Sequence, residues 1–289
     1  MAHETFQIGD LTAVIGDNEA YDDRRAGYSG IHRLVHRTLP ERSLFGVAGL
    51  NFEHIFDGEK DQLNLSGDRK VFFEPRNHPM EYRRIAADEA ELRQTPTPNY
   101  HLESWSRFKL VPPHYVDFTF RCKPHQHAFR YGYIGLFWAN YIHEPENKSI
   151  YFRDARGWVQ LCTQEHNNQS TVRHTEDKLE LKFLDVPEQT LYKNFSPLRF
   201  TEPFYYGYLG TTHLFILMFD RTEGVRFSHS PSSGGAPSFP NPAWDFQFIV
   251  PKYDVLEEYG FRARIAYRER CSREEIEQEF RRWRDSLGK

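Results

Sequence analysis

The chain has 289 residues, of which 39% are hydrophobic and 16% aromatic, and its formal net charge is -4. Lys and Arg are not clustered along the sequence, and the net charge is negative. The chain therefore lacks the basic surface that a nucleic acid or an anionic membrane would bind. The 24 Phe and 16 Tyr against three Met indicate a core of aromatic rings on strands rather than packed helices. At this length one large all-β domain is an ordinary outcome.

The three cysteines are widely spaced and odd in number. They suggest neither a disulfide framework nor a zinc site, so we expect buried free thiols, no metal and no cofactor. Residues 1–10 lack a basic patch followed by an apolar run, and no segment reaches about 18 consecutive apolar residues. We therefore expect a cytoplasmic chain with no nucleic-acid or membrane partner and leave a homo-oligomer open.

Strands are predicted by aromatic and β-branched runs bounded by Gly, Pro, Asn and Asp. In chain order these runs cover residues 5–16, 50–56, 71–76, 80–85, 104–110, 115–122, 133–142, three segments within 150–173, then 179–184, 204–209, 214–219, 244–250 and 261–267. The run 133–142 is apolar at odd and at even positions alike, which is typical of a strand that is buried between two layers. The run 115–122 alternates most clearly, with its inward positions at Val116, Phe118, Phe120 and Cys122.

One helix is predicted at the end of the chain, over residues 272–287. Ser272 and Glu275 form a capping box, and apolar residues recur behind it at helical spacing, at Ile276, Phe280, Trp283 and Leu287. This apolar stripe is expected to pack on the sheets or on a second subunit. No linker or composition shift divides the chain, so we expect one domain over 1–289.

The stretch 150–173 reads as strand, turn, strand, turn, strand. If its middle strand is regular, Trp158, Gln160, Gln164 and His166 point to one side. An aromatic plate, two amides and an imidazole suit a hydroxyl-rich ligand and the movement of its protons. The alternative is a solvated sheet face with one surface histidine.

Two further places combine ionisable and apolar residues. Glu53 and His54 are neighbours in an aromatic run. In a regular strand one of them must therefore point towards apolar side chains, where it needs a polar or charged partner. Glu74 and Arg76 flank Pro75 and form either a surface ion pair or part of a binding rim. For Glu53 and His54, a functional group and a satisfied structural pair both fit.

Segments 48–54, 137–142, 164–167 and 241–246 look like a bacterial all-β family without a known activity. The wider pattern, aromatic strands with His, Glu, Arg and Trp scattered on their faces, resembles the galactose-mutarotase-like supersandwich of sugar epimerases and polysaccharide lyases. That resemblance implies a large antiparallel β-sandwich with one C-terminal helix. A concanavalin-like jelly roll is the alternative.

We therefore expect a carbohydrate-active protein, a sugar epimerase (mutarotase) or lyase that uses a histidine and a carboxylate as acid and base. The candidate catalytic residues are His166, Glu53, His54, Glu165 and Glu74. The candidate residues for binding a sugar or oligosaccharide are Trp158, Gln160, Gln164, Arg173, Arg76, Trp105, Trp138 and Glu103. A non-catalytic carbohydrate-binding or accessory protein and a structural subunit of an assembly are the alternatives.

Overall fold

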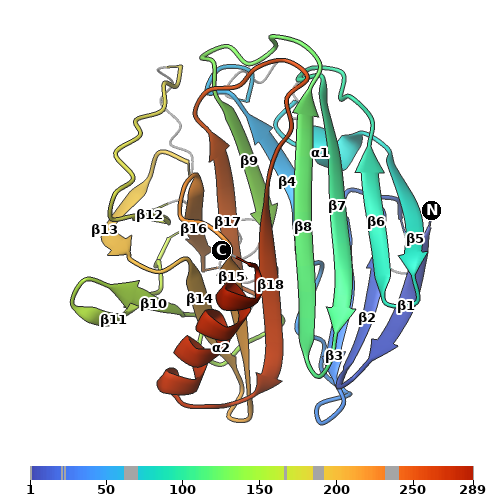
Figure 1. Ribbon diagram of the computed structural model, residues 1–289, viewed down its shortest axis with the longest axis vertical. Helices are drawn as coiled ribbons and strands as arrows, with labels where there is room; N and C mark the ends of the chain where they lie inside the picture. The colour runs from blue at the N-terminus through green and yellow to red at the C-terminus, as the bar shows by residue number, and fades with distance from the viewer. Residues whose placement is uncertain are drawn as a thin grey trace.

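The computed structural model describes residues 2–20, 22, 24–61, 71–165, 168–184, 192–231 and 241–288. Its strands form three sheets (Figure 1). The smallest is an antiparallel sheet at the N-terminus, made of β1 (His3–Ile8), β2 (Leu11–Gly16) and β3 (Gly30–His36). Its apolar side chains join the main hydrophobic core.

The two larger sheets form the sandwich. The nine-stranded sheet is antiparallel throughout and has the order β11 (Gly157–Leu161), β10 (Ile150–Asp154), β14 (Phe204–Leu209), β15 (His213–Phe219), β18 (Tyr259–Glu269), β8 (Tyr115–Pro124), β7 (Leu102–Val111), β6 (Glu89–Gln94), β5 (Met80–Ala86). The six-stranded sheet has the order β13 (Phe195–Phe200), β12 (Thr171–His174), β16 (Val225–Ser230), β17 (Ala243–Val250), β9 (Ile134–Ala139), β4 (Asn51–Phe56). Only β13 and β12 pair in parallel among these.

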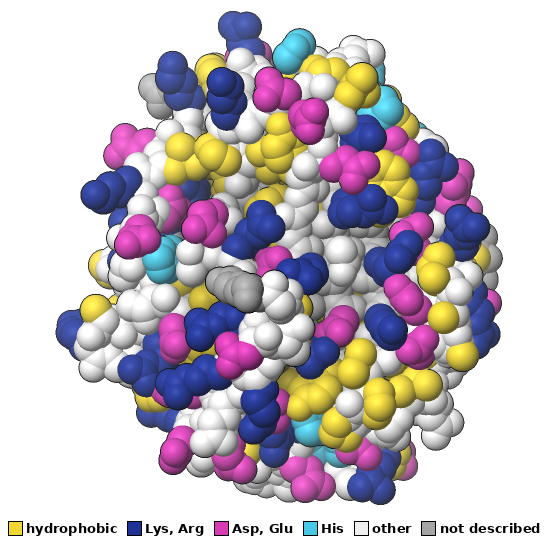
Figure 2. Space-filling view, viewed as in Figure 1, with side chains coloured by type: hydrophobic (Ala, Val, Ile, Leu, Met, Phe, Trp, Pro, Cys, Tyr) yellow, Lys and Arg dark blue, Asp and Glu magenta, His cyan; other side chains and the backbone are white. Residues whose placement is uncertain are grey.

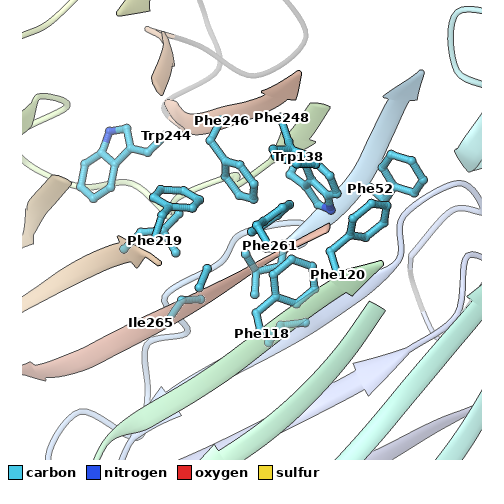
Figure 3. Close-up of a cluster of buried hydrophobic side chains, with 14 of the residues drawn as sticks. Phe52, Phe118, Phe120, Trp138, Phe219, Trp244, Phe246, Phe248, Phe261 and Ile265 are labelled. Atoms are coloured by element: carbon cyan, nitrogen blue, oxygen red, sulfur yellow. The ribbon is translucent and has the colours of Figure 1, made fainter. Parts of the chain in front are cut away.

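Aromatic rings fill the space between the two large sheets (Figure 3). The Trp138 ring stacks on Phe246 at 5.0 Å and on Phe52 at 5.1 Å between centroids, and meets Phe120 edge-on at 4.6 Å. The prediction of an aromatic core is confirmed. So is the alternation in β8, whose inward side chains are 0% exposed: Val116, Phe118, Phe120 and Cys122.

The C-terminal helix α2 (Arg273–Ser286) begins with the predicted capping box of Ser272 and Glu275. Its apolar stripe, Ile276, Phe280 and Trp283, is buried against side chains of β14, β15 and β18. The helix therefore covers the outer face of the nine-stranded sheet, where Figure 1 shows it in front. Within the described ranges no helix is long and apolar enough to cross a membrane.

The rest of that outer face is charged, with Lys and Arg interspersed among Asp and Glu (Figure 2). Arg93 pairs with Glu103 at 2.7 Å, and the Arg121 guanidinium lies 5.1 Å from the centre of the Trp105 ring. Opposite charges on neighbouring strands stabilise a sheet face modestly. Glu103 and Trp105 belong to this surface.

Two predicted strands are absent. Residues 71–76 form a turn and the short helix α1 (Glu74–Asn77), because Pro75 suits the first turn of a helix and cannot donate to a ladder. Residues 179–184 lie outside every strand. The third strand predicted within 150–173 exists as β12, but it lies in the six-stranded sheet, while the second ends at Leu161.

Replacing Trp138 with Ala should lower the free energy of unfolding by about 3–5 kcal/mol, because the cavity would lie between two stacked rings. The matched control is Trp105→Ala on the charged face, which should cost at most about 1 kcal/mol. Chemical denaturation measures both, and equal losses would contradict this description of the core.

Candidate functional site

The outer face of the six-stranded sheet, which points away from the nine-stranded sheet, is polar and yet buried. On β17, Trp244 and Phe246 belong to the core, so the alternate residues Asp245 and Gln247 point outward. Asp245 is 4% exposed, and Gln247 and its neighbour Arg226 on β16 are 0% exposed. Polar side chains buried in this number need partners, which makes this face the candidate site.

A β-bulge at the edge of this face brings Glu53 and His54 together. Phe52 lies opposite Trp138, but His54 lies opposite Phe137, so Glu53 is an extra residue on β4. The bulge lets both neighbouring side chains meet, with His54 Nε2 3.4 Å from Glu53 Oε2. The strand is therefore not regular here, and His54 points towards the aromatic rings of Phe72 and Phe137 with Glu53 as its partner, as expected for one of these two residues.

Glu53 is a buried carboxylate with several partners. Its Oε1 accepts hydrogen bonds from Arg76 Nη1 at 2.9 Å and from the Tyr141 hydroxyl at 2.5 Å. Burial alone would raise the pKa of Glu53, but the charges of His54 and Arg76 and the hydrogen bonds from His54 and Tyr141 lower it to about 2. Glu53 is thus ionised at any ordinary pH.

Two buried amides hold α1 so that Arg76 reaches Glu53. Asn18 Nδ2 donates to the backbone carbonyls of Pro75, Arg76 and His78, and Gln94 Nε2 donates to those of Pro75 and His78. Carbonyls at the end of a helix have no partner within it, so outside donors are needed. These contacts tie the position of Arg76 to β6 and to the loop after β2.

Asp245 is the second carboxyl group of the face. Its Oδ1 accepts a hydrogen bond from the backbone N–H of Asn140 at 2.8 Å. Burial raises the pKa of Asp245 well above its usual range, the N–H of Asn140 partly opposes this, and the charge of Glu53 raises it further. The pKa of one carboxyl group is therefore lowered and that of the other is raised, which is how two carboxyl groups in one site can divide acid and base roles.

Arginines occupy the other half of the face. In the sheet register Arg199 lies opposite Arg173, and Arg173 lies opposite Arg226. Arg226 Nε donates to Asp177 Oδ2 at 2.8 Å. A groove of about 790 Å³ is lined by both residues of this pair and by Leu179.

No family model and no curated protein sequence matches this chain. Among solved structures, a candidate aldose 1-epimerase from Escherichia coli K12 is 10% identical, covers 93% of this chain and 99% of its own, and superposes with a TM-score of 0.55. A galactose mutarotase related enzyme from Lactobacillus acidophilus is also 10% identical, covers 93% and 100%, and has a TM-score of 0.52. The chain has the galactose mutarotase-like fold. At this identity the likeness concerns the fold alone.

This result confirms the predicted sandwich class, in preference to a jelly roll. Heparan sulfate lyase HepC from Pedobacter heparinus is 9% identical, covers 91% of this chain and 34% of its own, and has a TM-score of 0.47. That value is too low to support an argument.

Within the mutarotase-like fold, four of the predicted site residues share the outer face of the six-stranded sheet: Glu53, His54, Arg76 and Arg173. Trp138 is in the core, where no ligand reaches its ring, and Glu103 and Trp105 lie on the charged face of the other sheet. Glu74 Oε1 accepts from the N–H of Asn99, and burial raises the pKa of this carboxyl group.

The predicted common face of Trp158, Gln160, Gln164 and His166 is wrong, because β11 ends before Gln164. Trp158 packs against β14 on the side of α2, and Gln160 donates to the Ser149 hydroxyl. Gln164 and Glu165 are exposed after the strand, and His166 lies outside the described residues.

Sequence reasoning missed Asp245, Gln247, Arg226 and Tyr141. The sequence signal that could have indicated Asp245 and Gln247 is their alternation with aromatic residues in 244–250. In the part of the chain that the structure describes, no group of three or more His, Cys, Asp or Glu side chains is arranged to hold a metal ion.

The low pKa of Glu53 predicts a specific acid sensitivity. Stability from its ionised form is complete above its ordinary pKa of 4.5 and is lost as pH falls towards 2, by on the order of 3 kcal/mol. In Glu53→Gln the free energy of unfolding should therefore fall less between pH 5 and 2 than in the unmodified protein. Glu165→Gln, at an exposed position, is the control and should follow the unmodified protein. Parallel curves for all three would refute the assignment.

Proposed function

We propose that this protein is a sugar isomerase of the aldose 1-epimerase type, and that it binds its sugar on the outer face of the six-stranded sheet at Asp245. The observation that carries the proposal is the pair of buried carboxyl groups with opposite pKa shifts, Glu53 and Asp245. The fold supports it, because two similar structures with TM-scores above 0.5 bear epimerase or mutarotase names.

Interconversion of anomers requires an acid at the ring oxygen and a base at the anomeric hydroxyl. In the proposed reaction Asp245 donates its proton to the ring oxygen as the bond from C1 to that oxygen breaks. The Glu53 carboxylate receives the proton of the anomeric hydroxyl. After rotation about the bond between C1 and C2, both transfers reverse and the ring closes as the other anomer.

The two carboxyl groups contribute unequally. With a pKa of about 2, Glu53 is a weak proton acceptor, and its negative charge adds to burial in raising the pKa of Asp245. His54 is less suited to proton transfer, because its Nδ1 contacts the carbonyl of Phe72 at 3.0 Å and its Nε2 faces Glu53. We therefore propose Glu53, and not His54, as the group that receives the anomeric proton.

Asp245→Asn should lower kcat for anomer interconversion by about 100-fold or more, because an amide cannot serve as the general acid. Polarimetry or NMR exchange on a panel of aldoses measures the rate, and Glu165→Gln is the control. A folded Asp245→Asn protein with an unchanged rate would refute the acid role. Sugar binding without any acceleration in the unmodified protein would favour a non-catalytic binding protein.

Activity should also depend on pH through Asp245. The protonated acid is present below its pKa, so the rate should fall as pH rises through that value. Glu53→Gln removes a negative charge that raises the pKa of Asp245, so the falling limb should move to lower pH. A purely structural role of Glu53 would change the amount of folded protein and leave the position of this limb unchanged.

A further inference from the structure

A row of four polar side chains crosses the sheet beside Asp245. The register places Arg199, Arg173, Arg226 and Gln247 next to one another on β13, β12, β16 and β17, with strands about 4.8 Å apart. We call these four residues the arginine row. The adjacent residues Val172 and Phe227 point into the core, so the row lies on the outer face.

The three arginines of the arginine row form few ion pairs among the described residues. Asp177 pairs with Arg226, and this is the one salt bridge that the three arginines make within the described residues. Arg199 Nη1 donates to the backbone carbonyl of Asp177 and not to its carboxylate. Burial and the charges of Arg199 and Arg226 lower the pKa of Arg173, while the charges of Asp177 and Glu180 partly oppose this. The Arg173 guanidinium lies 3.9 Å from the centre of the Phe195 ring.

Three atoms in the row have unused hydrogen-bonding capacity. Arg226 Nη1, Arg173 Nε and Gln247 Oε1 are buried and have no hydrogen-bond partner among the described residues. Gln247 Nε2 donates to the hydroxyls of Thr171 and Ser228, so reversing the amide would still leave one of its ends unpaired. Buried unpaired groups are costly, and two donors beside one acceptor match an anionic oxygen next to a hydroxyl.

The position of the row relative to Asp245 limits the size of the ligand. Asp245 lies opposite Ser228, and Gln247 lies opposite Arg226, so Arg226 is the diagonal cross-strand neighbour of Asp245. Such neighbours are about 7–8 Å apart. A substituent on a single sugar ring at Asp245 can therefore reach Arg226.

We propose that the arginine row is a subsite for an anionic substituent of the sugar, a carboxylate, sulfate or phosphate group. This inference rests on the proposed sugar site at Asp245 and adds the substrate class. The planar guanidinium groups of Arg173 and Arg226 supply paired N–H donors to the anionic oxygens. Gln247 Oε1 accepts from a ring hydroxyl.

The first experiment compares neutral and anionic sugars by isothermal titration calorimetry. Glucose and galactose are the neutral ligands, and glucuronate, galacturonate, glucose 6-phosphate and glucose 6-sulfate are the anionic ones. At least one anionic sugar should bind 10-fold or more tightly than its neutral parent, and this preference should shrink in high salt. The best anionic ligand identifies which of the three groups the row accepts.

The second experiment changes Arg173, whose loss leaves the pair of Arg226 and Asp177 intact. Arg173→Gln should weaken binding of the anionic sugar at least 10-fold without changing the affinity for the neutral one. Arg173→Lys keeps the charge but loses the planar donors, so it should restore part of the preference. Arg156→Gln removes an equal charge from a side chain that is 81% exposed on the hairpin of β10 and β11, and should change neither affinity.

The outcomes separate the two proposals. Equal affinities for neutral and anionic sugars, or equal losses of both in Arg173→Gln, would overturn the anionic subsite and leave the isomerase proposal standing. Selective binding of an anionic sugar without anomer interconversion would support the subsite and overturn the isomerase. If no sugar of either class binds, both proposals fall.

Discussion

A buried carboxylate such as Glu53 is stable only when donors and positive charge compensate for the water it has lost. That requirement organises the candidate site. Arg76 and Tyr141 donate to the carboxylate, and a bulge in β4 turns His54 towards it. Removing one partner would leave the other charges uncompensated, so these residues act as a unit.

The same requirement links distant parts of the chain. Asn18 and Gln94 fix the carbonyl end of α1, α1 presents Arg76, and Arg76 holds Glu53 ionised. The Glu53 charge then raises the pKa of Asp245 on β17. The proposed proton donor in the middle of the sheet therefore depends on two amides outside it, Asn18 and Gln94.

The six-stranded sheet separates packing from chemistry by its two faces. One face interdigitates aromatic rings with the nine-stranded sheet, and the other carries the carboxyl groups and the arginine row. This arrangement supports both proposals with one geometry: a proton donor at Asp245, an ionised carboxylate on one side and guanidinium groups on the other. The charged face of the nine-stranded sheet has a different character, since its acidic and basic groups largely pair with each other.

Sequence alone determined the class of fold, the alternation of β8 and the C-terminal helix with its capping box, because period and capping are local properties. It also singled out Glu53, His54, Arg76 and Arg173. It failed after Leu161, because regular alternation was extended past the end of β11. Tertiary structure decided the rest: the bulge that unites Glu53 with His54, the register that aligns three arginines, and the placing of Trp138 in the core. Bulges, cross-strand register and the choice of face arise from contacts between residues far apart in the chain, so no local pattern records them.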